Sequence, residues 1–178
     1  MKQLIIGIMS DTHDHVDNTL KAIDVFIERK VERIIHLGDI ISPFIPRFIK
    51  RKLDEKNYNV DLVTVLGNND GDVYLLSKIY SEYGWILLSN PSIIEIENKK
   101  FYIMHGFNGV DFTEKIAKAL LEKLDVNGVL YGHTHRLKKE YFNNKLLLNP
   151  GEVCGYLTGK STIAILDTDT LTVEIIEL

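Results

Sequence analysis

Short, continuously apolar segments, each followed at once by a cluster of polar residues, recur along this chain of 178 residues. Segments this apolar are typical of strands that are covered on both faces, as in the parallel sheets of α/β proteins. The stretches between them carry apolar residues at helical spacing and predict amphipathic helices that cover the sheet. The sequence therefore predicts a layered α/β sandwich.

Three strand–helix pairs come first in the expected order, and a strand-rich half with one further helix follows. Strands are expected at residues 4–9, 33–37, 61–66, 86–88, 92–97, 101–104, 128–131, 138–142, 145–148, 162–166 and 172–176. Helices are expected at residues 18–30, from near Pro43 and Pro46 to Glu55, at 73–83 and at 113–124, the last with Asp111 or Thr113 as its N-cap. Turns are expected at residues 98–100 and at Asn143-Asn144. The length suits one domain with a sizeable core, so residues 1–178 are interpreted as a single domain.

The composition argues against several classes of protein. The formal net charge is −4, which is unfavourable for a surface that binds the phosphate backbone of nucleic acids. The chain has one cysteine, Cys154, which forms no intrachain disulfide and is interpreted as a small core residue. The first apolar segment is too short to cross a membrane and lacks the features of a signal peptide. We therefore expect a cytoplasmic protein with neither a nucleic-acid nor a membrane partner.

Five polar clusters follow the apolar segments and contain four of the six histidines of the chain. They are Ser10-Asp11-Thr12-His13, Gly38-Asp39, Gly67-Asn68-Asn69-Asp70, His105-Gly106 and Gly132-His133-Thr134-His135. In open α/β sheets, ligands bind beyond the carboxyl ends of the strands, so these clusters are expected to converge. In the first and last clusters, a spacing of two places both candidate ligands on the same side of an extended segment. Five clusters of Asp, Asn and His at successive strand ends predict a metal site.

This series of clusters resembles, in order and in residue type, the signature of the calcineurin-like metallophosphoesterase superfamily. The small size and the segment 149–151 are similar to its compact bacterial and archaeal branch, which contains small phosphodiesterases and resembles the eukaryotic retromer subunit Vps29. The resemblance implies a four-layer αββα sandwich with a dinuclear metal site. One metal would be held by Asp11, His13 and His135, the other by Asn68, His105 and His133, with Asp39 as the bridge. It also implies catalytic roles for Asp39, Asn68 and His105.

The implied ligand set limits the metals that fit. Two divalent metals and the carboxylates of Asp11 and Asp39 leave a net positive centre, even with a bridging hydroxide, and this suits an anionic phosphoester. Nitrogen and oxygen ligands with four imidazoles disfavour calcium and magnesium and leave manganese, iron, nickel, cobalt or zinc. The resemblance favours manganese. The expected function is hydrolysis of a small phosphodiester by hydroxide held between two divalent metals.

Asn69 departs from the pattern of the family. Many relatives carry His at this position, between the Asn and the Asp of the third motif, as the general acid for the leaving group. An asparagine amide cannot donate a full proton at neutral pH, so poor leaving groups are expected to react slowly unless His15 or another residue substitutes. The small branch tends to lack this His as well, so the change can reflect the subfamily rather than inactivation.

Several other polar residues are interpreted as structural. His15 is expected on a surface loop and His36 in the core, and Asp70 is expected to orient the loop of Asn68. Residues 149–151 either shape a loop near the site or form a plain turn.

Two alternative functions remain open at this stage. One is a protein-binding scaffold of the Vps29 type with little or no catalysis, and the other is a phosphomonoesterase or a nuclease. The enzyme is favoured because every ligand position is filled and no exposed apolar docking stripe is evident in the sequence. The sequence leaves open the physiological substrate, the native metal, the oligomeric state, including a homo-oligomer, and any replacement for the missing general acid.

Overall fold

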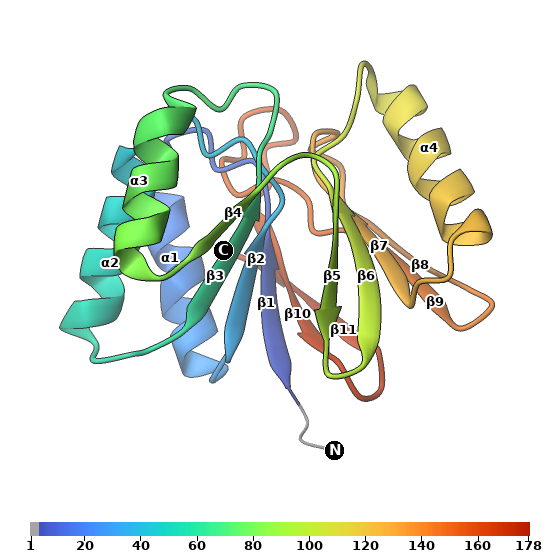
Figure 1. Cartoon of the computed structure of the whole chain (residues 1–178), viewed down its shortest axis with the longest axis horizontal. Helices are drawn as coiled ribbons and strands as arrows, with labels where there is room; N and C mark the ends of the chain where they lie inside the picture. The colour runs from blue at the N-terminus through green and yellow to red at the C-terminus, as the bar shows by residue number, and fades with distance from the viewer. Residues whose placement is uncertain (1–3) are drawn as a thin grey trace.

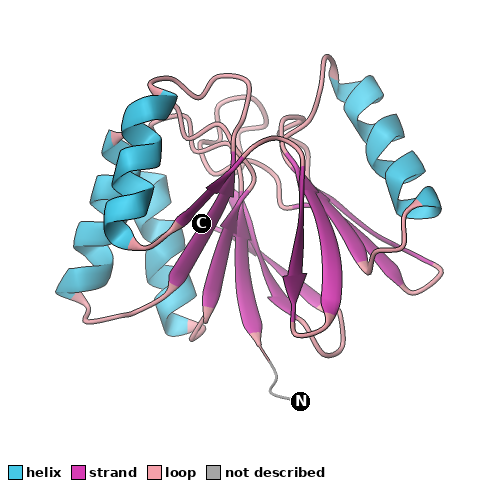
Figure 2. Cartoon of the chain, in the orientation of Figure 1, coloured by secondary structure: helices cyan, strands magenta, loops and turns pink. Residues whose placement is uncertain are grey.

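Two β-sheets face each other in the centre of the molecule, and helices cover the outer face of each sheet (Figure 1). The computed structural model describes residues 4–178. Helices lie on both outer sides of the pair of sheets, as Figure 2 shows. The helices span Val16–Glu28 (α1), Phe44–Glu55 (α2), Val73–Tyr83 (α3) and Val110–Lys123 (α4). This arrangement confirms the predicted four-layer αββα sandwich.

Each sheet is built around a set of parallel strands. The first sheet has the order β11-β10-β1-β2-β3-β4 and the second has the order β5-β6-β7-β9-β8. The first contains β1 (Ile5–Met9), β2 (Arg33–His36), β3 (Asp61–Val65), β4 (Ile86–Leu88), β10 (Thr162–Asp167) and β11 (Val173–Glu177). The second contains β5 (Ser92–Ile96), β6 (Lys99–Met104), β7 (Gly128–Tyr131), β8 (Lys138–Phe142) and β9 (Lys145–Asn149). Strands β1 to β4 are parallel, and so are β6, β7 and β9.

Three apolar clusters fill the spaces between the four layers. The central cluster lies between the sheets and includes the fully buried side chains of Ile8, Val65, Ile103 and Leu130. A second cluster packs α1, α2 and α3 on the first sheet, and a third packs α4 on the second sheet. Because both faces of the parallel strands are covered, these strands are continuously apolar in sequence.

The turn between β5 and β6 is tighter than the sequence predicts. Glu97 and Asn98 make this turn, with φ angles of 48° and 64°, so β6 already begins at Lys99. The expected turn at residues 98–100 is therefore wrong at its last two positions. Lys99 and Lys100 instead pair with Ile96 and Glu95 across the hairpin.

The start of α4 also differs from the prediction. The helix begins at Val110 with Gly109 at its N-cap, so the expected N-cap at Asp111 or Thr113 is wrong. The Thr113 hydroxyl instead donates a hydrogen bond to the carbonyl oxygen of Phe107 at 2.7 Å, which closes the loop before the helix. No helix within residues 4–178 combines the length and the apolar character needed to cross a membrane.

Candidate metal centre

The loops that follow the parallel strands meet at one end of the two sheets, where Figure 2 shows loop segments gathered between them. The loops after β1, β2 and β3 come from the first sheet, and those after β6 and β7 come from the second. Parallel strands place their carboxyl ends on the same edge, which explains how residues more than a hundred positions apart become neighbours.

Two buried carboxylates form the centre of this group. The Oδ2 atom of Asp39 lies 3.3 Å from Nε2 of His13 and 3.3 Å from Nε2 of His105. The Oδ1 atom of Asp11 lies 3.4 Å from Nε2 of His135 and 3.7 Å from Nε2 of His13. Asp11 and Asp39 are 0% and 1% exposed, so each carboxylate faces imidazoles rather than water.

Asn68 and His133 lie at the outer side of the group. The Oδ1 atom of Asn68 is 3.1 Å from Nε2 of His105. The ring of His133 is 5.1 Å from the ring of His105, and its Nε2 is 2.5 Å from the carbonyl oxygen of Asn108. The structure therefore brings all seven predicted ligands to the same edge, with His133 turned toward a backbone carbonyl.

The donor atoms fit a divalent cation. Asp11 Oδ1 and His13 Nε2 are buried and have no partner in hydrogen-bond geometry, although buried polar atoms normally have one. Ligand atoms of Asp11, His13 and His135 lie within 4.8 Å of one another, and so do those of Asp11, Asp39 and His105. The oxygen and imidazole donors are those that transition-metal ions accept.

The pKa values of these groups reflect the same concentration of negative charge. The carboxylates of Asp11 and Asp39 raise the pKa of His13 to about 10. Burial favours a higher pKa for the Asp39 carboxyl, but contacts with His105 and His13 outweigh burial and hold this pKa well below its usual range. Burial lowers the pKa of His105, but Asp39 beside it raises the value above the ordinary one. A divalent cation would supply the positive charge that protons supply here and would leave the imidazoles neutral.

The backbone at the ligand positions adopts an uncommon conformation. Positive φ angles occur at Asp11 (54°), His13 (41°), Asp39 (56°), His133 (67°) and His135 (59°). Only a few per cent of non-glycine residues have φ above zero, and such residues gather at functional sites. Five of the seven predicted ligands thus share a backbone conformation that is uncommon outside functional sites.

Two glycines allow the loops to approach this closely. A Cβ atom on Gly67 would lie 2.2 Å from Oδ1 of Asp39, and one on Gly132 would lie 2.0 Å from Oγ of Ser10. Real Cβ atoms do not make contacts this short, so a side chain at either position would displace a ligand loop.

The structure also tests the residues that were interpreted as structural. Asp70 accepts backbone hydrogen bonds from Gly67 and Ile41, which confirms that it orients the loop of Asn68. His36 is fully buried and lies 3.1 Å from the Thr12 hydroxyl, so the core interpretation is confirmed. His15 is half-buried at the N-cap of α1, where its Nδ1 accepts a hydrogen bond from Asn18.

Residues 149–151 are more than a plain turn. The side-chain amide of Asn149 donates to the carbonyl oxygen of Gly132 and to the Thr134 hydroxyl, both at 3.0 Å. Asn149 thereby holds the loop that carries His133 and His135, which favours the first of the two predicted roles. Cys154 is 3% exposed, as expected of a small core residue.

Sequence reasoning missed Glu152 and the contact that Asn69 makes with Asp39. Glu152 is fully buried, and its Oε2 lies 2.6 Å from Nδ1 of His135. Asn69 donates from its backbone and its side-chain amide to the two oxygens of Asp39, at 2.9 and 2.8 Å. The signal that could have indicated Glu152 is its place just after β9, a sixth strand end on the same edge.

Two cavities adjoin different predicted ligands. One of about 500 Å³ is lined by Asn68, Asn90, Phe107, Asn108 and His133. The other, of about 400 Å³, is lined by His135, Arg136, Leu137, Thr158 and Lys160, among others. Both cavities therefore offer space next to predicted ligands for parts of a phosphoester.

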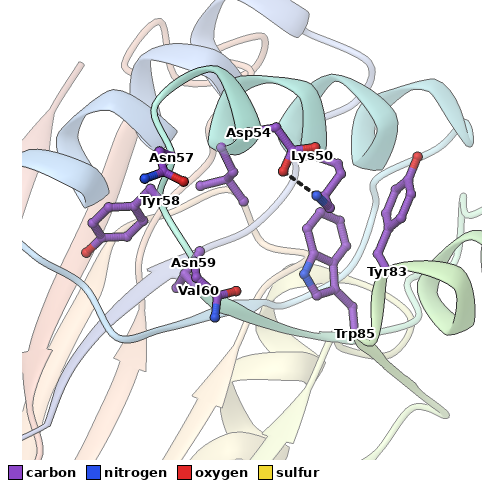
Figure 3. A pocket seen from close by; sticks show the side chains of 9 residues that line it. Lys50, Asp54, Asn57, Tyr58, Asn59, Val60, Tyr83 and Trp85 are labelled. Carbon is purple, nitrogen blue, oxygen red and sulfur yellow. Dashed lines mark hydrogen bonds and ion pairs between the residues drawn. The ribbon is translucent and has the colours of Figure 1, made fainter.

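A further cavity of about 200 Å³ lies away from the ligands (Figure 3). It is formed where α2 ends and where β3 and β4 begin, and Trp85, Tyr83 and the hydrogen-bonded pair Lys50 and Asp54 line it. The predicted ligands follow the opposite, carboxyl ends of the strands, so this cavity is separate from the site.

Known proteins resemble this chain in sequence and in structure. The sequence profile of the calcineurin-like phosphoesterase superfamily domain matches residues 4–171. Phosphodiesterase MJ0936 of Methanocaldococcus jannaschii is 39% identical over 165 residues, which cover 92% of this chain and 93% of that protein. A structure described as that of a novel archaeal phosphodiesterase has a TM-score of 0.84 at 36% identity, covering 98% and 100% of the two chains. Vps29 of Chaetomium thermophilum has a TM-score of 0.67 at 17% identity over 98% and 97%, which shows a shared fold alone.

Proposed function

The chain belongs to the calcineurin-like phosphoesterase superfamily, and we propose that the residues of its candidate metal centre hydrolyse a small phosphodiester. The protein is a metal-dependent phosphodiesterase. We propose that it holds two divalent metals. Their ligands are Asp11, His13 and His135 for one metal and Asn68, His105 and His133 for the other, with Asp39 shared between them.

Asp39 is the central residue of the proposed metal site because it lies between the two ligand sets. Its Oδ2 lies at the same distance, 3.3 Å, from the imidazoles of His13 and His105, which belong to the two different ligand sets. A carboxylate placed between two sets of donors can serve both of them. Bound there, two divalent ions would make hydroxide available near neutral pH and stabilise the charge on the phosphoryl group.

The chain itself would position the substrate and the ligands. The Nδ1–H group of His105 donates a hydrogen bond to the carbonyl oxygen of Leu37, 2.7 Å away, and this contact fixes the direction of its Nε2. Asn68 lies beside that Nε2 and lines the cavity of about 500 Å³, where one arm of the diester can enter. Asp39, Asn68 and His105 are therefore our proposed catalytic residues.

Asn69 is engaged with Asp39 and supplies no proton to the leaving group. Its amide donates to the Asp39 carboxylate at 2.8 Å, and an amide has no acidic proton near neutral pH. We infer that the enzyme favours diesters whose leaving group departs without protonation, such as aryl or other acidic alcohols.

We further propose manganese as the metal and the cytoplasm as the location. Four imidazoles with carboxylate and amide oxygens exclude none of the late first-row metals, so manganese rests on the family resemblance. The cytoplasmic location rests on the single cysteine, Cys154, which suits a reducing compartment.

The substitution Asp39→Asn tests the shared carboxylate. We expect the variant to contain less manganese per chain and to lose most of its turnover of bis-p-nitrophenyl phosphate, because an amide carries no negative charge to hold two cations. Asp17→Asn, at an exposed position of α1, is the matched control and should retain both properties. Near-normal turnover of Asp39→Asn with its metal content intact would contradict the proposed bridging role of Asp39.

The same assay separates the enzyme from a scaffold of the Vps29 type. Turnover that appears on addition of manganese and disappears with a chelator supports the enzyme. A protein that takes up manganese but turns over neither phosphodiesters nor phosphomonoesters would favour the scaffold.

A further inference from the structure

Glu152 is a buried carboxylate that connects a predicted metal ligand with an exposed loop. It is fully buried, and its two oxygens face different parts of the molecule. Oε2 lies 2.6 Å from Nδ1 of His135 and accepts from the Cys154 thiol at 3.1 Å. Oε1 accepts from the backbone N–H and the hydroxyl of Thr158, at 2.6 and 2.7 Å, and from the backbone N–H of Leu157 at 3.0 Å.

The contact with His135 determines which ring nitrogen is free. A carboxylate has only acceptors, so Nδ1 of His135 must carry the proton in this contact. The neutral ring then presents the lone pair of Nε2, which lies 3.4 Å from Oδ1 of Asp11. A histidine binds a metal through an unprotonated nitrogen, and a carboxylate at the other nitrogen fixes both the tautomer and the ring orientation.

The other contacts of Glu152 leave it little capacity to bind a metal itself. Its carboxylate, the thiol of Cys154 and Nδ1 of His135 lie within 4.8 Å of one another, a spacing that a metal could also use. Each oxygen already accepts at least two hydrogen bonds, however, and the thiol donates rather than coordinating. This pattern is that of a group that orients a ligand.

The loop held by Glu152 forms one wall of a cavity beside His135. Thr158 and Lys160 line this cavity of about 400 Å³ together with His135. Tyr156 and Leu157 of the same loop are 62% and 74% exposed, so the loop is held by the hydrogen bonds to Glu152 rather than by burial of its apolar side chains.

We propose that Glu152 is a positioning residue that fixes His135 in the Nδ1–H tautomer and ties it to the cavity loop at residues 155–160. The inference rests on the proposed function, because it takes His135 as a metal ligand. Replacing a residue that supports a metal-binding histidine typically weakens metal affinity about 10–100-fold.

Glu152→Gln is the decisive variant because it changes charge with almost no change in shape. A glutamine has one acceptor and one donor group, whereas both oxygens of Glu152 receive donors. In one orientation its NH₂ group meets Nδ1 of His135 and favours the wrong tautomer. In the other it meets the N–H groups of Leu157 and Thr158 and releases the loop.

The first measurement uses metal-free protein and needs no activity. The ¹⁵N chemical shifts of histidine, recorded at alkaline pH, report which nitrogen carries the proton. We expect the Nδ1–H form of His135 in the wild type and in Cys154→Ala, which removes the other donor to the same oxygen. We expect a mixture or the Nε2–H form in Glu152→Gln, and a retained Nδ1–H form in Glu152→Asp if the shorter carboxylate still reaches the ring.

The second measurement is calorimetric titration with Mn²⁺. We expect Kd to rise about 10–100-fold in Glu152→Gln and to stay within about threefold of wild type in Cys154→Ala. Thr158→Val, which loses one donor to Oε1, should raise KM for bis-p-nitrophenyl phosphate with Mn²⁺ affinity unchanged. If Glu152→Gln does not fold, Glu152→Asp and Thr158→Val carry the test.

These outcomes distinguish a failure of the proposed function from a failure of the inference about Glu152. A wild type that binds no Mn²⁺ would remove the proposed function, while the tautomer data would still decide whether Glu152 positions the ring. Wild-type Mn²⁺ affinity in Glu152→Gln, or a wild-type His135 found in the Nε2–H form, would overturn the inference about Glu152.

Discussion

Asp70 joins two of the ligand loops through its carboxylate, and its replacement gives a sharp test of how the centre is held. Oδ2 accepts hydrogen bonds from the backbone N–H groups of Gly67 and Asp39, at 2.6 and 3.2 Å. Oδ1 accepts from the N–H of Ile41 at 2.8 Å. In Asp70→Asn, one of these two positions must be taken by an NH₂ group, so at least one backbone N–H then faces a donor.

The expected loss of stability follows from the hydrogen bonds that the substitution removes or weakens. If the asparagine keeps its oxygen at the Oδ2 position, the bond from Ile41 is lost and the other two become bonds to a neutral acceptor. A hydrogen bond to a charged group contributes about 1.5–3 kcal/mol, and one to a neutral group about 0.5–1.5 kcal/mol. With mid-range values, the lost bond costs about 2 kcal/mol and each weakened bond about 1 kcal/mol, so we expect Asp70→Asn to lower the free energy of unfolding by about 4–5 kcal/mol. Because Asp39 and Asn68 lie on the two loops that separate, Mn²⁺ affinity should fall as well.

Urea unfolding in the presence of a chelator measures this loss without any contribution from bound metal. Asp169→Asn, in the exposed turn between β10 and β11, is the control and should stay within about 0.5 kcal/mol of wild type. A loss below about 1 kcal/mol for Asp70→Asn, or unchanged Mn²⁺ affinity despite the expected loss of stability, would refute the claim that this carboxylate holds the two loops together.

Two further substitutions test the leaving-group chemistry and the close packing of the loops. Asn69→His should raise turnover of alkyl phosphodiesters about 100-fold or more relative to aryl diesters, because it restores a proton donor beside Asp39, and a steady-state comparison of the two substrate types measures this ratio. An unchanged ratio would weaken the account of the missing acid. Gly132→Ala should destabilise the protein by about 1–3 kcal/mol and reduce Mn²⁺ uptake, since its Cβ would lie 2.0 Å from Ser10 Oγ and 3.0 Å from Asp11 Oδ2. Gly109→Ala, where a Cβ has open space, is the control in thermal unfolding, and equal losses in the two variants would contradict the packing argument.

Many helices and strands were predictable because the local sequence pattern of each agrees with the place that it takes in the fold. The helix at Val73–Tyr83 and the strand at Gly128–Tyr131 occur where they were expected, since amphipathic spacing and a run of buried residues are strong local signals. The start of α4 was not predictable in this way. Gly109 caps it without a side chain, whereas the polar candidates Asp111 and Thr113 lie inside the helix.

The candidate site was likewise predictable in part. The convergence of the strand ends follows from parallel topology, so neighbours such as Asp39 and His105 could be expected from sequence. The supporting contacts depend on side-chain directions that no spacing encodes. Glu152 lies 17 positions from His135, and only the fold places its carboxylate against Nδ1 of that ring. The assignment of the seven residues as metal ligands stays a prediction.

The division of the candidate centre between two sheets has an evolutionary consequence. Within residues 4–178, strand pairing stays inside each sheet, and apolar side chains such as Ile8 and Ile103 fill the space between the sheets. The spacing between the candidate ligands of β1 to β3 and those of β6 and β7 therefore depends on the volume of these apolar side chains as well as on the polar contacts between the loops. Selection on catalysis must act on these core residues too. A lineage could change the spacing of its candidate ligands by exchanging an isoleucine for a valine between the sheets while every candidate ligand stays the same.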